Sequence, residues 1–176
     1  MSLFLGVGSK NAESRRKCNT EGVSVVYQFF PQSTQAVKAA VIEEPTRLHT
    51  YEQLRHEDFA DPTPLDPWTS LHIDKIVEMA TQIAGMLKEG QVVMIICQAG
   101  KNRSRTLAGI AQRIYKLENL VEPKGDVIPL PEDDTLAAFV EVFDEGDPLV
   151  REKLLKSMRA TGIEGQGRAK RSRFAA

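Results

Sequence analysis

Five consecutive apolar residues, Val92 to Ile96, constrain the fold of this chain more than any other feature. A strand that is apolar at every position must be buried on both faces, which is typical of a largely parallel sheet covered by helices. An amphipathic helix pattern precedes this run over 73–87, and another follows it over 104–117. The sequence therefore predicts an α/β fold with a central, mostly parallel sheet flanked by helices.

Weaker patterns on either side predict further elements. Residues 36–42 fit a strand or a short helix equally well, and prolines and acidic residues concentrated over 56–68 indicate a long polar loop of the kind that often carries function. The other expected elements are an edge strand at 3–5, a helix at 11–18 ended by Gly22, strands at 23–30 and 48–54, and helices at 133–144 and 147–159.

Length and composition limit the class of protein. The chain has 176 residues, of which 41% are hydrophobic, and its net charge is −1. A chain of this size can bury a substantial core, which excludes a disordered protein. The balanced charge argues neither for nor against nucleic acid as a partner. We expect one domain over 1–160, followed by a basic, flexible tail over 161–176.

Cysteine and histidine usage narrows the chemistry. The two cysteines, Cys18 and Cys97, cannot make a disulfide framework or a cysteine-rich zinc site, and they favour a reducing, cytoplasmic compartment. His49, His56 and His72 do not form a ligand-like cluster, so we expect no metal and no cofactor. No run reaches the roughly 18 apolar residues of a membrane span, so we expect no transmembrane segment.

The polar segment after the apolar run carries the chemistry. A glycine-containing loop that leads from a buried strand into a helix turns successive N–H groups toward one point, and the helix dipole adds positive potential there. Arg103 lies six residues after Cys97 and can grip two phosphate oxygens with its planar fork. The residues expected to bind phosphate are Gln98, Ala99, Gly100, Lys101, Asn102 and Arg103.

Cys97 itself has two interpretations. It can be an ordinary buried cysteine at the end of a core strand, as most cysteines with apolar neighbours are. It can also face the anion-binding loop, where the positive potential would stabilise the thiolate, the form that attacks. The polar sequence that follows Cys97 and ends in Arg103-Ser104 favours the second interpretation, because packing does not explain it.

The string Cys-x5-Arg-Ser over 97–104 resembles the signature of the protein tyrosine and dual-specificity phosphatases. Gly100 falls where that family needs glycine, and the loop joins a buried strand to a helix. Upstream, the run Leu3-Phe4-Leu5-Gly6, a helix, and a strand opened by Gly22-Val23 look like the start of a small dual-specificity domain. The resemblance covers most of the expected domain as a pattern and implies a dual-specificity phosphatase-like fold.

The resemblance also implies a mechanism. Cys97 would be the nucleophile that forms a cysteinyl-phosphate intermediate. Arg103 would bind the phosphoryl group, and Ser104 would hydrogen-bond the thiolate and help it leave. The family has histidine immediately before the cysteine, where it favours the thiolate, whereas this chain has Ile96.

The family's general acid is an aspartate on a loop that precedes the cysteine, so the resemblance places it on the acidic loop. Asp58 follows the strand-like stretch that ends at Leu54 and is the first choice. Asp66, 31 residues before Cys97, fits the family's commonest spacing and is an alternative, as is Asp61.

The implied substrate is a phosphorylated protein carrying phosphotyrosine, phosphoserine or phosphothreonine. With Lys101, the loop resembles that of relatives that act on phosphoinositides. Together with the basic tail, this lysine leaves open the alternative of a phosphoinositide or RNA 5′-phosphatase. The tail also leaves open a contact with acidic lipid or RNA. Ile96 leaves open a third interpretation, a catalytically weak phosphate-binding module.

Overall fold

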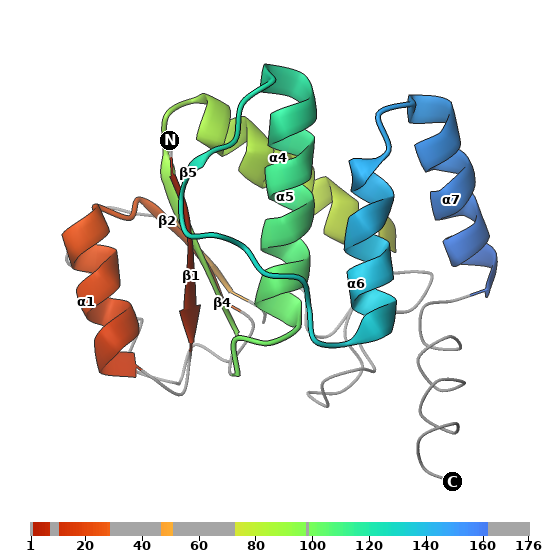
Figure 1. The fold of residues 1–176 in the computed structure, drawn as a ribbon. Coiled ribbons are helices and arrows are strands. Elements are labelled where there is room, and N and C mark those ends of the chain that lie inside the picture. Colours follow the sequence, from red (N-terminus) through yellow and green to blue (C-terminus); the bar gives the residue numbers. More distant parts are fainter. Residues whose placement is uncertain (1, 8–10, 29–46, 51–72, 98, 162–176) are drawn as a thin grey trace, which may run out of the picture.

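A computed structural model describes residues 2–7, 11–28, 47–50, 73–97 and 99–161 of the chain (Figure 1). The strands are β1 (Ser2–Val7), β2 (Val25–Gln28), β3 (Arg47–Thr50), β4 (Val92–Cys97) and β5 (Lys124–Gly125). The helices are α1 (Asn11–Glu21), α4 (Ile73–Lys88), α5 (Arg103–Asn119), α6 (Asp134–Glu141) and α7 (Pro148–Thr161), with a 3-10 turn, η2 (Val142–Asp144).

The described strands form one sheet in the order β3-β2-β4-β1-β5, and each neighbouring pair is parallel. The apolar strand β4 lies at the centre, between β2 and β1. This position explains why β4 is apolar at every residue, because both of its edges are paired and both of its faces are covered. The predicted α/β fold with a mostly parallel sheet and flanking helices is confirmed.

The two faces of β4 belong to separate apolar clusters. Ile95 and Cys97 pack in the larger cluster, which includes side chains of α4, α5, α6 and α7. Ile96 packs in the smaller cluster together with Cys18 of α1. Because successive side chains of a strand point to opposite faces, α1 covers one face of the sheet and the pair α4 and α5 covers the other (Figure 1).

The helices lie where their patterns predict them, with different ends. The helix expected at 11–18 continues to Glu21, and Gly22 follows it with a φ of 64°. The helix expected at 133–144 is divided into α6 and η2. No helix in the described ranges is both long enough and apolar enough to cross a membrane.

The edge position predicted for the first strand is wrong. β1 pairs with β4 on one side and with β5 on the other, where Leu3 is the register partner of Gly125. The two-residue strand β5 was not predicted, because a segment this short has no hydrophobic period of its own. Residues 36–42, the acidic loop at 56–68 and the tail from 162 lie outside the described residues.

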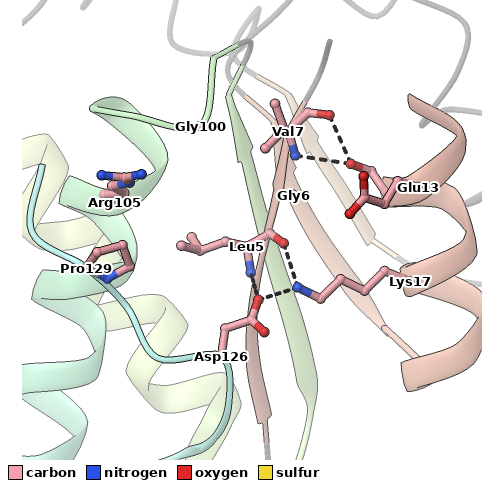
Figure 2. A pocket seen from close by; sticks show the side chains of 10 residues that line it. Leu5, Gly6, Val7, Glu13, Lys17, Gly100, Arg105, Asp126 and Pro129 are labelled. Carbon is pink, nitrogen blue, oxygen red and sulfur yellow. Dashed lines mark hydrogen bonds and ion pairs between the residues drawn. The ribbon is translucent and has the colours of Figure 1, made fainter. Parts of the chain in front are cut away.

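Side chains occupy the edge of β1 beyond β5 (Figure 2). The Leu5 N–H donates to Asp126 Oδ2 at 2.9 Å, and Lys17 Nζ donates to the Leu5 carbonyl at 3.1 Å and pairs with Asp126. The Ser14 hydroxyl donates to the Val7 carbonyl at 2.9 Å and accepts from the Val7 N–H at 3.1 Å. These contacts satisfy the backbone polar groups and stop another strand from adding to this edge.

We predict that Asp126→Ala lowers the free energy of unfolding by about 1–3 kcal/mol, because it leaves the Leu5 N–H without its acceptor and the Lys17 ammonium without its counter-charge. Urea denaturation of both proteins measures the difference. Glu118→Ala removes an exposed carboxylate from α5 and serves as the control, with an expected change of less than about 0.5 kcal/mol. Equal losses in the two variants would contradict a structural role for Asp126.

Candidate functional site

The loop after β4 lies at the point where the sheet changes its winding direction. The chain leaves β1 through α1 on one face and leaves β4 through α5 on the opposite face, and these two strands are neighbours. Their last residues, Val7 and Cys97, are register partners. In open α/β sheets such a point forms a crevice at the carboxyl ends of the strands, where ligands bind.

Cys97 is the last residue of β4, and its sulfur lies beside polar groups. Its side chain is 2% exposed. Cys97 Sγ accepts the Gly100 N–H at 3.2 Å and lies 3.1 Å from the buried hydroxyl oxygen of Ser104. The loop therefore brings the Gly100 N–H and the Ser104 hydroxyl within hydrogen-bond distance of Cys97 Sγ.

Gly100 is at the position in the loop that requires glycine. Its φ is +68°, in the left-handed region, and an added Cβ would lie 2.7 Å from Val7 Cγ2. Any other side chain at this position would be strained in its backbone and would also clash with the end of β1. The N–H that reaches Cys97 Sγ depends on this conformation.

The first turn of α5 has no side-chain cap. Asn102 occupies the N-cap position, but its side-chain oxygen accepts the Asp133 N–H at 2.9 Å instead. The Asn102 carbonyl accepts from the N–H and the hydroxyl of Thr106, at 2.9 and 2.8 Å. The first turn also carries no acidic side chain, so the helix presents its positive end toward the loop, as suits an anion.

A segment distant in sequence forms a second support of the loop. The Glu132 N–H donates to the Lys101 carbonyl at 3.1 Å, and the Glu132 carboxylate lies 3.7 Å from Lys101 Nζ. Both side chains are largely exposed, so this ion pair contributes little to stability. Asp133 caps α6 by accepting the Leu136 N–H at 2.9 Å. Asp133 begins the helix that the sequence predicts at 133–144, but nothing in the sequence predicts that this segment contacts the loop.

The predicted site residues fall into two groups. Gly100 and Ser104 each contact Cys97 Sγ, Arg103 is half-buried at the first position of α5, and Ala99 is exposed. The others lie outside the described residues: Gln98 and the three general-acid candidates Asp58, Asp61 and Asp66. Ile96 is fully buried on the α1 face, so the position where the phosphatase family has histidine belongs to the core.

Cys18 differs from Cys97 in its surroundings. It is buried between α1 and the sheet, with Sγ 3.3 Å from Met94 Sδ. Burial raises the pKa of the Cys18 thiol to about 11, and the nearby Lys17 offsets only part of this effect. Cys18 therefore stays protonated near neutral pH. Among the described residues, no three His, Cys, Asp or Glu side chains gather as a metal ion would require.

No protein-family model matches this chain, and no curated protein or solved structure matches it. The assignment of a function therefore rests on the residues of the loop and their geometry.

We predict that Gly100→Ala destabilises the fold by about 1–3 kcal/mol, the cost of a non-glycine residue in a sparsely populated backbone region, and weakens vanadate binding. Thermal unfolding and vanadate titration measure the two effects. Gly85→Ala is the matched control, because it lies inside α4 with open space around an added Cβ and should be neutral or stabilising. Adding Val7→Ala to Gly100→Ala should recover the part of the stability loss that comes from the steric clash. Vanadate binding by Gly100→Ala at the wild-type level would contradict a role of the left-handed Gly100 conformation in anion binding.

Proposed function

We propose that this protein is a cysteine-dependent phosphatase with a dual-specificity phosphatase type of fold, which hydrolyses phosphate monoesters through a cysteinyl-phosphate intermediate. The observation that carries the proposal is the position of Cys97 Sγ, within hydrogen-bond distance of both the Gly100 N–H and the Ser104 hydroxyl. A catalytic thiol must stay reduced, so the proposal includes a cytoplasmic location.

In the first step the substrate phosphate occupies the loop over 97–104. The Cys97 thiolate forms a bond to phosphorus, and the ester bond between phosphorus and the leaving oxygen breaks. Arg103 and the N–H groups at the start of α5 hold the three phosphoryl oxygens and stabilise their charge. A protonated aspartate gives its proton to the leaving oxygen. The proposed acid is Asp58, with Asp66 and Asp61 as alternatives.

In the second step the same aspartate, now ionised, takes a proton from water, and the water oxygen attacks phosphorus. The bond between sulfur and phosphorus breaks, and the electron pair returns to Cys97 Sγ. The Ser104 hydroxyl and the Gly100 N–H stabilise this thiolate as it leaves. The products are the dephosphorylated alcohol or phenol and inorganic phosphate.

The proposed substrate is a phosphorylated protein with phosphotyrosine, phosphoserine or phosphothreonine. Lys101 supports a more anionic alternative, a phosphoinositide or an RNA 5′ phosphate, because its side chain is 57% exposed in the loop. Turnover of phosphopeptide, phosphoinositide and 5′-triphosphorylated RNA, compared at equal concentration, separates these substrates.

A second candidate function is a phosphate-binding module without useful turnover. Two observations favour it: Ile96 is buried in the core where the family has a histidine, and Cys97 is 2% exposed. Such a module would bind phosphate and vanadate through the loop but would not release product from a small aryl phosphate.

We predict that Cys97→Ser abolishes turnover of an aryl phosphate and preserves the fold, because a hydroxyl in this loop is a far weaker nucleophile than a thiolate. Initial rates and thermal unfolding measure the two properties. Cys18→Ala is the control and keeps the wild-type rate per folded molecule, since Cys18 lies in the α1 cluster away from the loop. Turnover by Cys97→Ser near the wild-type rate would exclude the cysteinyl-phosphate mechanism.

We predict that Asp58→Asn slows turnover of an alkyl phosphate by about 10²–10⁴-fold, the contribution typical of a general acid. The basic limb of the pH profile should flatten in this variant, because activity no longer depends on keeping a carboxyl group protonated. Asp61→Asn and Asp66→Asn are the matched comparisons. If Asp66→Asn loses turnover and Asp58→Asn keeps the wild-type rate, the position of the general acid follows its spacing from Cys97 rather than the end of the preceding strand.

A further inference from the structure

A cleft of about 270 Å³ lies along the edge of β1, next to the proposed phosphate loop (Figure 2). One wall comes from α1 and the other from α5, with β1 between them. Gly100 belongs to both the cleft and the loop, so the cleft borders the loop at this residue.

The charges of the cleft are only partly balanced. At one end Lys17 and Asp126 pair with each other and with the backbone of Leu5, so neither is available to a ligand without breaking these contacts. The other two ionisable side chains of the cleft are Arg105 on the α5 wall and Glu13 on the α1 wall. Neither forms an ion pair with any residue in the described ranges.

One buried donor of Arg105 has no acceptor. Its Nη1 donates to the Leu130 carbonyl at 3.3 Å. Its Nε is buried and has no hydrogen-bond partner. A buried donor without an acceptor costs about 1–3 kcal/mol, and more when the group is charged. An oxyanion in the cleft would supply the counter-charge that Arg105 lacks among the described residues, and it would also satisfy Nε if the side chain turns toward the cleft.

We propose that Arg105 binds a second oxyanion of the substrate whose scissile phosphate occupies the loop over 97–104. The preferred substrate then carries two anionic groups, the second being a phosphate or a carboxylate held by the planar fork of Arg105. Glu13 on the opposite wall repels a second negative charge there, so it directs that group toward Arg105. This inference rests on the proposed phosphatase function and adds its substrate class.

The test compares matched phosphotyrosine peptides. One has alanine near the phosphotyrosine, a second has glutamate at that position, and a third has phosphoserine, each placed one, two or three residues away. The readout is the ratio of kcat/KM for each charged peptide to that for the alanine peptide, because a ratio within one variant cancels any general loss of activity. The glutamate and phosphoserine arms distinguish a carboxylate from a phosphate as the second group.

We expect the wild-type ratio to be about 10- to 100-fold for at least one charged peptide, the range for a hydrogen bond between charged groups. Arg105→Gln should bring the ratio to about one, and Arg105→Lys, which keeps the charge but not Nε, should give an intermediate value. Glu13→Gln should raise the ratio. Arg113→Gln removes an arginine of α5 that pairs with Asp144 outside the cleft, and should retain the wild-type ratio.

Each result separates this inference from the proposed function. Turnover with a ratio near one in the wild type, or a ratio unchanged in both Arg105 variants, would overturn the second-oxyanion site and leave the phosphatase standing. If no peptide is hydrolysed, calorimetry of the same peptides with the wild type and Arg105→Gln decides the matter. Binding that prefers the charged peptide and is lost in Arg105→Gln would overturn hydrolysis and support the site, whereas binding without that preference would overturn both.

Discussion

The parallel pairing of β1 with β4 is the constraint on which the site depends. It makes Val7 the register partner of Cys97, so the end of β1 stands beside the start of the loop. Val7 fills the space into which a side chain at position 100 would project, and Gly100 in its left-handed conformation directs an N–H to Cys97 Sγ. A shift of this pairing by one residue would turn every side chain of the shifted strand to the other face of the sheet and separate these contacts.

Neighbouring residues of β4 have different roles, because their side chains lie on opposite faces of the sheet. Ile96 points into the apolar cluster under α1, whereas Cys97 points toward the α5 face and meets the Ser104 hydroxyl. Burial raises the pKa of the Cys18 thiol to about 11. The two cysteines differ in their neighbours, because Cys97 Sγ lies within hydrogen-bond distance of an N–H and a hydroxyl, whereas Cys18 Sγ lies beside a methionine sulfur.

The contacts along the edge of β1 both stabilise the fold and border the cleft. Asp126, Lys17 and Ser14 satisfy the exposed backbone groups of Leu5 and Val7, which blocks strand addition. Because these side chains occupy the strand edge, the space between α1 and α5 stays open as a cleft beside the loop. Among the charged side chains of the cleft, Arg105 is a cation that no carboxylate in the described residues neutralises.

The chain's own pattern determined the kinds of element and the position of the loop. The apolar run from Val92 predicted a strand buried on both faces, and the helical spacing of the neighbouring segments predicted helices against it. The resemblance of 97–104 to the phosphatase signature also implied that Ser104 contacts the Cys97 sulfur and that Gly100 is required, and the structure has both residues in contact with that sulfur. Only the tertiary structure decided that β1 lies inside the sheet, that Glu132 and Asp133 support the loop, and that Arg105 lines a cleft. Those contacts join residues far apart in sequence. The hydrophobic periodicity of an element predicts which of its faces is buried, but it does not predict which other element covers that face.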